Sequence, residues 1–133
     1  MKLTVVGGGG VRAPLFVAST LRRSDLIGLD DICLLDVDEN KLRIMGSICR
    51  HIVATAGQPV RVVTTTDPQA AFEGARYVVT TIRVGGDEGR ILDEKIALRH
   101  GVLGQETTGP GGLAMAMRSI PAILKYAELL RQI

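Results

Sequence analysis

The chain contains no tryptophan, and aromatic residues make up only 3% of its 133 residues. A core built from this sequence must therefore rely on aliphatic packing. Aliphatic side chains are plentiful, because hydrophobic residues account for 46% of the chain. The length suits one domain with a substantial core.

Other absences exclude whole classes of protein. The net charge is only +2, with basic and acidic residues interleaved, which argues against a nucleic-acid partner. Cys33 and Cys49 match no paired metal-binding spacing and predict core thiols in a reducing cytosol. No apolar run reaches membrane-spanning length, and the first residues predict a strand rather than a signal peptide. We therefore expect a cytoplasmic protein without a membrane partner.

Strand-like and helix-like segments alternate along the chain. Short runs rich in β-branched and aliphatic residues predict strands at 2–6, 31–36, 60–65 and 77–82. Apolar residues at helical spacing predict helices at 12–23, 39–56, 67–72, 87–99 and 113–133. Pro121 is expected to kink the last helix or to start a second one. The side chains expected to face inward include Leu15, Val17, Ala18 and Leu21 in the first helix, and Ile91, Leu92 and Ile96 in the fourth.

This alternation predicts the fold class. Continuous apolar strands separated by helices are typical of a parallel sheet covered on both faces. The handedness of the crossovers favours the strand order 3-2-1-4 and an α/β, Rossmann-like domain over residues 1–133. A further strand would follow the last helix in such a fold, so we expect the fold to be incomplete at the C-terminus.

A run of four glycines between the first strand and the first helix predicts a dinucleotide site. Gly8-x-Gly10-x-x-Ala13 matches the pattern G-x-G-x-x-A, and a register starting at Gly7 matches its first half. Without Cβ atoms the backbone approaches a pyrophosphate closely, and amides at the positive helix end hold its charge. The predicted cofactor-binding residues in this segment are Gly7, Gly8, Gly9, Gly10, Val11 and Arg12.

Asp36 ends the second strand, where a carboxylate accepts hydrogen bonds from both ribose hydroxyls. It would repel a 2′-phosphate, so NAD is favoured over NADP. Asp38 is the weaker alternative for this role. Thr66, after the third strand, is expected to line the adenine side. A glycine turn without a ligand is the structural alternative.

The segment after the fourth strand predicts the substrate edge, because ligands of open α/β sheets bind at the carboxyl ends of the strands. Arg83 and Arg90 lie seven residues apart around glycines, which suits a doubly charged oxyanion such as a phosphate. The alternative is that Arg90 pairs on the helix surface with Asp87, Asp93 or Glu94.

A nine-residue run from Gly104 to Gly112 holds four glycines and one carboxylate, Glu106. Such a run is not expected to form a regular helix or strand, because glycine loses much backbone entropy on ordering. It predicts a loop whose backbone approaches something closely.

These motifs together resemble glycoside hydrolase family 4, and most closely its 6-phospho-β-glucosidases. The resemblance rests on the glycine-rich start with Pro14, on Thr-Asp-Pro at 66–68, on Ile-Arg-Val-Gly-Gly at 82–86 with Arg90, and on 104–112 followed by Met-Arg-Ser-Ile at 117–120. This NAD-dependent family is an exception to two-carboxylate glycoside hydrolysis. The resemblance implies a redox elimination with NAD and a divalent metal, usually manganese.

The resemblance also implies residue roles. Arg90 would bind the sugar 6-phosphate, with Arg83 as a neighbouring partner, and Glu106 would raise the basicity of a catalytic tyrosine. In family members the tyrosine base, the metal-binding Cys and His and a substrate-binding Asn come later than residue 133. We therefore expect residues 1–133 to be the NAD-binding domain, without a metal site and inactive alone, with the catalytic remainder of the family absent.

For the complete enzyme the expected substrate is a phosphorylated disaccharide or glucoside, and the expected assembly is a homo-oligomer. Two other functions are kept as alternatives. One is a lactate- or malate-type NAD dehydrogenase, which gives no reason for the 104–112 run. The other is a non-catalytic NAD-binding module.

Overall fold

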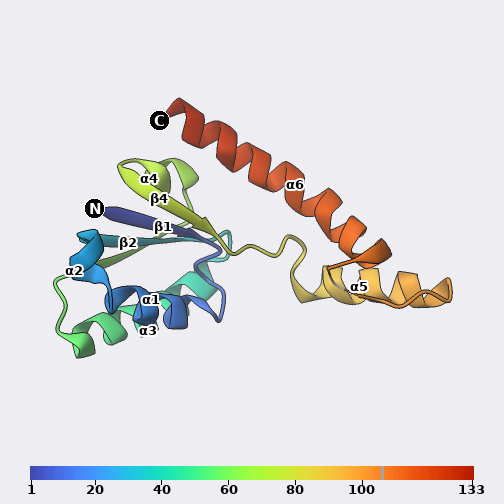
Figure 1. Ribbon diagram of the computed structural model, residues 1–133, viewed down its shortest axis with the longest axis horizontal. Coiled ribbons are helices and arrows are strands. Elements are labelled where there is room, and N and C mark those ends of the chain that lie inside the picture. The colour runs from blue at the N-terminus through green and yellow to red at the C-terminus, as the bar shows by residue number, and fades with distance from the viewer. Residues whose placement is uncertain (106) are drawn as a thin grey trace. The chain divides into compact units, whose positions relative to one another are not determined.

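A computed structural model describes residues 1–105 and 107–133. The chain divides into two compact units, Met1–Ile82 and Arg83–Gln132. Figure 1 shows both units.

The first unit is built on a four-stranded parallel sheet. Its strands are β1 (Lys2–Val6), β2 (Asp31–Leu35), β3 (Arg61–Thr65) and β4 (Ala75–Thr80), in the order β3-β2-β1-β4. The predicted strand order is confirmed, although β4 begins and ends two residues earlier than expected. Val6 pairs with Leu35 and with Thr80, and Leu35 pairs with Thr65. The residues that follow these strands therefore emerge along one edge of the sheet.

Four helices complete this unit: α1 (Ala13–Leu21), α2 (Ser24–Ile27), α3 (Glu39–Ala56) and α4 (Pro68–Phe72). The predicted bounds of α3 are confirmed, because the sequence supplies both ends. The Asp38 side chain accepts a hydrogen bond from Lys41 N at 3.0 Å at its start, and Gly57 adopts φ +64° at its end. The predicted helix at 12–23 is shorter than expected, and α2 was not predicted.

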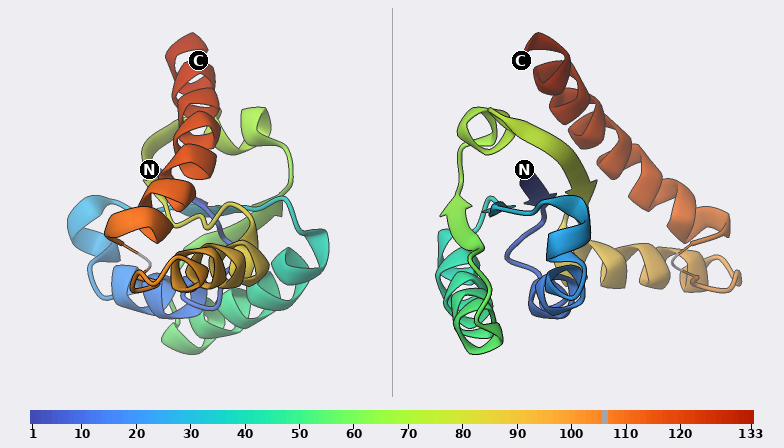
Figure 2. Two further views of the ribbon diagram at one scale, coloured as in Figure 1. Left: turned by 90° about the vertical axis from the view of Figure 1, so that its right-hand side faces the viewer. Right: turned by 60° about the vertical axis from the view of Figure 1, so that its left-hand side comes forward.

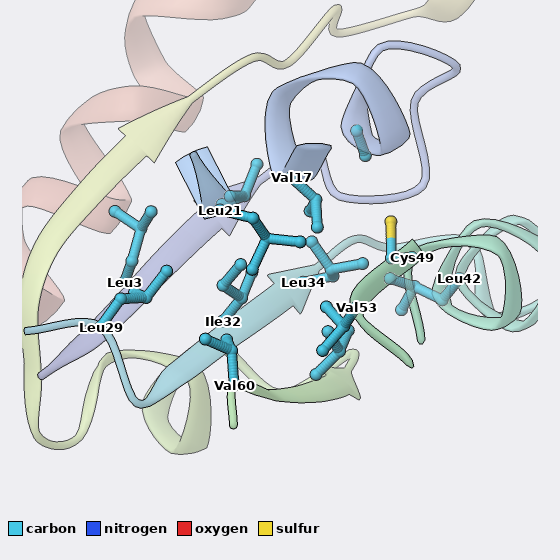
Figure 3. Close-up of a cluster of buried hydrophobic side chains, with 13 residues drawn as sticks. Leu3, Val17, Leu21, Leu29, Ile32, Leu34, Leu42, Cys49, Val53 and Val60 are labelled. Atoms are coloured by element: carbon cyan, nitrogen blue, oxygen red, sulfur yellow. The ribbon is translucent and has the colours of Figure 1, made fainter. Parts of the chain in front are cut away.

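The core lies between the sheet and the pair α1 and α3, which lie side by side (Figures 1 and 2). Because side chains alternate along a strand, Leu3, Ile32 and Leu34 point to this face (Figure 3). Thr4 points to the other face, where its hydroxyl donates to Ala71 O of α4 at 2.7 Å. Fully burying one aliphatic side chain, such as that of Ile32, contributes about 1.5–3 kcal/mol to the stability of the fold.

The inward face predicted for the first helix is correct in part. Val17 and Leu21 are buried, whereas Leu15 is 74% exposed. The buried residues of α1 are spaced by four, at Ala13, Val17 and Leu21. Leu15 lies on the opposite side of that stripe, which explains its exposure.

The second unit consists of α5 (Gly86–Arg99) and α6 (Gly109–Gln132), which pack against each other. One prediction is wrong here, because Gly109–Gly112 forms the first turn of α6 rather than a loop. Of the two outcomes expected at Pro121, no second helix starts there, since α6 continues through it, and a kink stays a prediction. Gly109 has φ +68°, so the chain enters the helix through a conformation that glycine adopts without strain. Pro110 is tolerated because amides of a first turn need no helical partner.

The predicted inward face of α5 is also wrong. Ile91, Leu92 and Ile96 are 49%, 54% and 44% exposed. The two buried residues of α5 are Asp93 and Ala97, which lie one turn apart on one helix face. Asp93 is buried because a cation on α6 pairs with it, as described below. No helix in the described part of the chain is both long and apolar enough to span a membrane.

Candidate functional site

The first candidate site is the glycine turn, residues 7–10, at the carboxyl end of β1. Gly7 N and Gly8 N both donate to Leu35 O, at 2.8 and 2.9 Å, and Gly10 N donates to Gly7 O at 3.0 Å. Gly9 N donates to Asp36 Oδ2 at 2.9 Å. All four glycine amides are therefore used inside the protein.

The amides that follow the turn are different. Within residues 1–105 and 107–133, neither Val11 N nor Arg12 N donates a hydrogen bond to a protein acceptor. Both residues are exposed and precede α1, with Arg12 as its N-cap. The sequence pattern predicts cofactor binding by all of residues 7–12. In the structure, only the amides of Val11 and Arg12 among these six residues are available to an anion.

The glycines themselves are required by close packing. A methyl group on Gly7 would lie 2.7 Å from Thr81 O, and Gly7 also has φ +93°. A methyl group on Gly8 would lie 2.5 Å from Leu34 Cβ. Ala13 is 5% exposed and packs in the core, as the small third residue of the Gly8-x-Gly10-x-x-Ala13 register should.

Asp36 follows β2 and is half-buried. Its Oδ2 accepts from Gly9 N, and its Oδ1 accepts from Asp38 N at 3.2 Å. A carboxylate offers about four acceptor positions, so positions remain for a ligand. Asp38, the alternative, caps α3, and the hydrogen bond from the Lys41 backbone lowers the pKa of its carboxyl. The helix cap already uses Asp38, which favours Asp36 as the carboxylate that receives a ligand.

Thr66 follows β3 at the same edge of the sheet and is exposed. It lines an open hollow with about 940 Å³ of empty space, together with Thr65 and with Glu39, Asn40 and Arg43 of α3. The structure thus brings Gly9 and Asp36 into contact and leaves Thr66 in a neighbouring open hollow.

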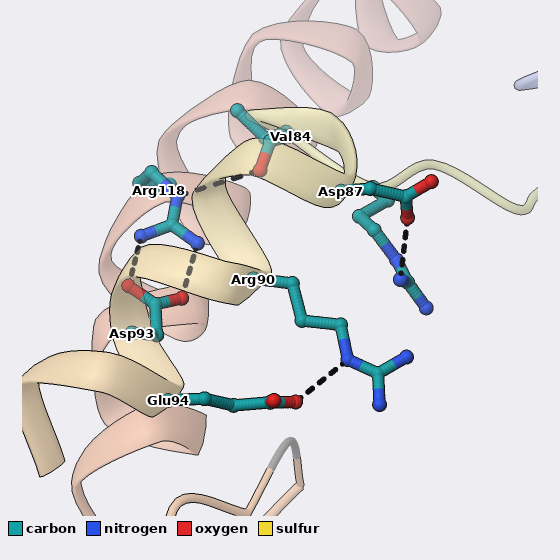
Figure 4. Close-up of polar contacts among 7 residues, drawn as sticks. Val84, Asp87, Arg90, Asp93, Glu94 and Arg118 are labelled. Carbon is teal, nitrogen blue, oxygen red and sulfur yellow. Dashed lines mark hydrogen bonds and ion pairs between the residues drawn. The ribbon is translucent and has the colours of Figure 1, made fainter. Parts of the chain in front are cut away.

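The second candidate site is a small pocket of the second unit, called the anion pocket from here on. The guanidinium groups of Arg83, Arg90 and Arg118 line it, and Asp93, Glu94 and Gln105 are among its other lining residues. Figure 4 shows the ion pairs around it. Arg83 Nη1 lies 3.1 Å from Asp87 Oδ1, and Arg90 Nε lies 2.8 Å from Glu94 Oε1.

Both of these pairs join residues four positions apart and are at least partly exposed, with Arg83 in the turn before α5 and Arg90 on the helix itself. Exposed ion pairs of this kind typically contribute only about 0.2–1 kcal/mol. The pairing of Arg90 with Glu94 is the surface alternative that the sequence left open. Phosphate binding by Arg83 and Arg90 stays a prediction, and Glu106 lies outside the described residues.

The pair formed by Asp93 and Arg118 was missed by the sequence analysis. Arg118 Nη1 and Nη2 donate to the two oxygens of Asp93 at 2.9 and 2.5 Å. These hydrogen bonds hold the pKa of the Asp93 carboxyl below its usual value, and the carboxylate raises the pKa of Arg118. One signal was available: Gly89, Asp93 and Ala97 are spaced by four, and an acid within a stripe of small residues needs a partner on the helix packed against it.

The glycine-rich run approaches the protein's own backbone. A methyl group on Gly104 would lie 2.8 Å from Glu94 O of α5, and one on Gly111 would lie 2.5 Å from Gln105 O. Thr108 Oγ1 donates to Gln105 Oε1 at 2.9 Å. The prediction of a close backbone approach is confirmed at these two glycines.

The residues described by the structure include no group of three or more His, Cys, Asp or Glu placed to hold a metal ion. Manganese therefore does not fit these residues. Cys33 and Cys49 are unpaired and buried, as predicted. Burial raises the pKa of both thiols, that of Cys49 to about 11.

The parallel order β3-β2-β1-β4, with a glycine turn before α1 and a carboxylate at the end of β2, places the chain among Rossmann-like α/β domains, a fold that binds dinucleotides. The particular family follows from its sequence: the model of the family 4 glycosyl hydrolases matches residues 2–133, and the chain belongs to this family. The resemblance seen in the motifs is thereby confirmed. Family membership decides against the lactate- or malate-type dehydrogenase.

The relatives include both 6-phospho-β-glucosidases and 6-phospho-α-glucosidases. The chain is 38% identical over 130 residues to a probable 6-phospho-β-glucosidase of Bacillus subtilis, covering 96% of this chain and 29% of the relative. It is 37% identical over 128 residues to 6-phospho-α-glucosidase 1 of Lacticaseibacillus paracasei, covering 96% and 29%.

A solved structure of the Thermotoga maritima 6-phospho-β-glucosidase with NAD and glucose-6-phosphate superposes with a TM-score of 0.93 at 33% identity, covering 99% of this chain and 32% of that one. Another structure of that enzyme also holds manganese. The chain therefore spans about three-tenths of the length of these relatives.

Proposed function

We propose that this chain is the NAD-binding part of a 6-phospho-β-glucosidase that acts on phosphorylated disaccharides or glucosides. The observation that carries the proposal is the pair of available amides, Val11 N and Arg12 N, after a glycine turn that itself contacts the Asp36 carboxylate through Gly9 N. This arrangement occurs in a family whose solved members hold NAD and glucose-6-phosphate.

The described residues fit NAD in a specific way. The amides of Val11 and Arg12, at the positive end of α1, would hold the pyrophosphate. The glycine turn keeps side chains out of its path. Asp36 would accept hydrogen bonds from the ribose hydroxyls and disfavour a 2′-phosphate, and Thr66 would line the adenine side. NAD supplies hydride acceptance and return when bound.

The anion pocket would receive the sugar phosphate. Arg90 would bind the phosphate, with Arg83 beside it, because planar guanidinium groups suit two oxygens of one anion. The dianion would compete with the carboxylates of Asp87, which pairs with Arg83, and of Glu94, which pairs with Arg90. A phosphate carries more charge than either carboxylate, so the competition favours the ligand.

Glu106 keeps the role that the family resemblance implies. Its negative charge would raise the basicity of a catalytic tyrosine, since a nearby anion favours proton uptake. Manganese is proposed for the complete enzyme and not for the described residues of this chain.

Assembly and location are further parts of the proposal. A homo-oligomer is supported by exposed apolar side chains on α6, among them Leu113, Met117 and Leu124. A cytoplasmic location is supported by the unpaired thiols of Cys33 and Cys49, which suit a reducing compartment.

The test is calorimetric titration of the chain with NAD and, separately, with glucose-6-phosphate, using glucose and inorganic phosphate as controls. We expect NAD to bind and glucose-6-phosphate to bind more tightly than glucose. Binding of neither ligand contradicts the proposal. A non-catalytic NAD-binding module predicts NAD binding without any binding of glucose-6-phosphate, so the same titrations separate the two functions.

A further inference from the structure

We propose that Arg118 is a positioning residue of the anion pocket. Through Asp93 and Val84 it fixes the turn before α5, and thereby the placement of Arg83 and Arg90, without itself binding the anion. The ligand named in this inference rests on the proposed function, whereas the positioning of the turn does not.

The first support is the number of donors that Arg118 commits to the protein. Its Nη1 and Nη2 donate to the two oxygens of Asp93 at 2.9 and 2.5 Å, and its Nε donates to Val84 O at 3.4 Å (Figure 4). A guanidinium has five N–H donors in a rigid plane, so three of them fix its orientation. The contacts reach the middle of α5 and the turn that precedes it.

The second support is burial. Asp93 is 8% exposed, whereas the side chain of Asp87, the partner of Arg83, is 88% exposed. A buried carboxylate needs its partner far more than an exposed one does, because removal of the partner leaves an uncompensated charge away from water. The pair of Asp93 and Arg118 is therefore a fixed connection between α5 and α6, unlike the pair of Arg83 with Asp87.

The third support is the fit of the guanidinium against backbone. A methyl group on Gly85 would lie 3.2 Å from Arg118 Nε, and one on Gly89 would lie 3.3 Å from its Nη2. Gly85 also has φ +85°, in the region that favours glycine. Arg118 therefore lies against the turn and the first part of α5, the segment that carries Arg83 and Arg90.

The alternative role for Arg118 is direct binding of the anion, since it lines the same pocket. Two of its donors point to the Asp93 carboxylate, whose charge compensates its own. An anion would have to displace a buried carboxylate to obtain these donors. Arg83 and Arg90 pair with more exposed carboxylates and are the better direct ligands.

The two roles predict opposite results for Asp93→Asn. If Arg118 positions the turn, this substitution loosens the turn and weakens binding of glucose-6-phosphate. If Arg118 binds the anion directly, the substitution removes a competing negative charge and tightens binding. Asp87→Asn is the matched control, because it removes an exposed carboxylate from the same helix and leaves the connection to α6 intact.

The experiment measures amide hydrogen exchange and glucose-6-phosphate affinity in the whole chain for Asp93→Asn, Arg118→Lys and Asp87→Asn. We expect the first two to speed exchange across residues 84–94 and to weaken affinity by about tenfold to a hundredfold. Exchange in β1 and β2 serves as the internal check on folding and should not change. Arg118→Lys keeps the charge but loses the two-point contact with Asp93. If Asp93→Asn also speeds exchange in β1 and β2, the result for Arg118→Lys decides the question.

Unchanged exchange at 84–94 in Arg118→Lys, or tighter binding in Asp93→Asn, would overturn the inference. If the unmodified chain does not bind glucose-6-phosphate, the proposed function fails, and the exchange data alone decide whether Arg118 positions the turn.

Discussion

The backbone N–H of Gly9 donates a 2.9 Å hydrogen bond to Oδ2 of Asp36, which joins the turn after β1 to the end of β2. The two residues meet because Val6 and Leu35 pair in register, so both strands end at the same level. The carboxylate proposed to bind the ribose therefore also holds the shape of the glycine turn. A change at Asp36 should affect both the pyrophosphate and the ribose contacts of NAD.

Gly7→Ala should destabilise the chain more than Gly28→Ala. Both glycines have positive φ, +93° and +61°, but only Gly7 would place a methyl group against Thr81 O, whereas Gly28 has open space. We expect a loss of about 1–2 kcal/mol for Gly28→Ala from backbone strain and a clearly larger loss for Gly7→Ala. Urea denaturation measures both, and equal losses would contradict the close approach at Gly7.

Gly104→Ala should weaken binding of glucose-6-phosphate, because the added methyl group would push the run away from Glu94 of α5. Gly101→Ala is the control, since Gly101 has φ +69° with open space around it and introduces backbone strain alone. Calorimetric titration compares the two variants. An equal affinity in both would mean that the contact between Gly104 and α5 does not shape the anion pocket.

The stability of the chain should depend on pH through Asp93. The hydrogen bonds from Arg118 lower the pKa of this carboxyl in the folded chain. A lowered pKa contributes stability above the unfolded value, about 4, and this stability is lost as the pH falls through the folded value. The difference in unfolding free energy between the unmodified chain and Asp93→Asn should therefore shrink from about pH 5 to pH 2.

Asp31→Asn provides a parallel measurement in the first unit. Arg61 donates to both oxygens of Asp31, at 2.7 and 3.1 Å, and these hydrogen bonds lower the pKa of Asp31. The difference in unfolding free energy between Asp31→Asn and the unmodified chain should shrink over the same pH range. A difference for Asp93→Asn that stays constant with pH would contradict the assigned ion pair.

Local signals in the sequence predicted much of the first unit. The bounds of α3 followed from an N-cap acid, Asp38, and a terminal glycine, Gly57, both of which act within one turn of the helix. The strand order followed from the alternation of strands and helices. The glycine turn and Asp36 followed from their positions at the ends of β1 and β2.

Interactions between distant residues were not predictable in the same way. The partner of Asp93 lies 25 residues further along the chain, so periodicity on α5 favoured its apolar side chains instead. The first turn of α6 was read as a loop, because its glycines have a low intrinsic helix propensity that the tertiary structure overrides. The use of all four glycine amides inside the turn is likewise visible only in three dimensions.

The most direct test of the account is a titration of the chain with NAD and NADP, repeated for Asp36→Ala and Asp38→Ala. The unmodified chain should bind NAD more tightly than NADP. Asp36→Ala should weaken NAD binding about tenfold or more, because NAD loses its hydrogen bonds to a charged group. The same substitution should narrow the difference in affinity between NAD and NADP. Asp38→Ala should lower the stability of the chain, because a helix cap is lost, and should leave the preference for NAD over NADP unchanged. Equal affinities for NAD and NADP in the unmodified chain, or a preference that Asp36→Ala does not alter, would contradict the account.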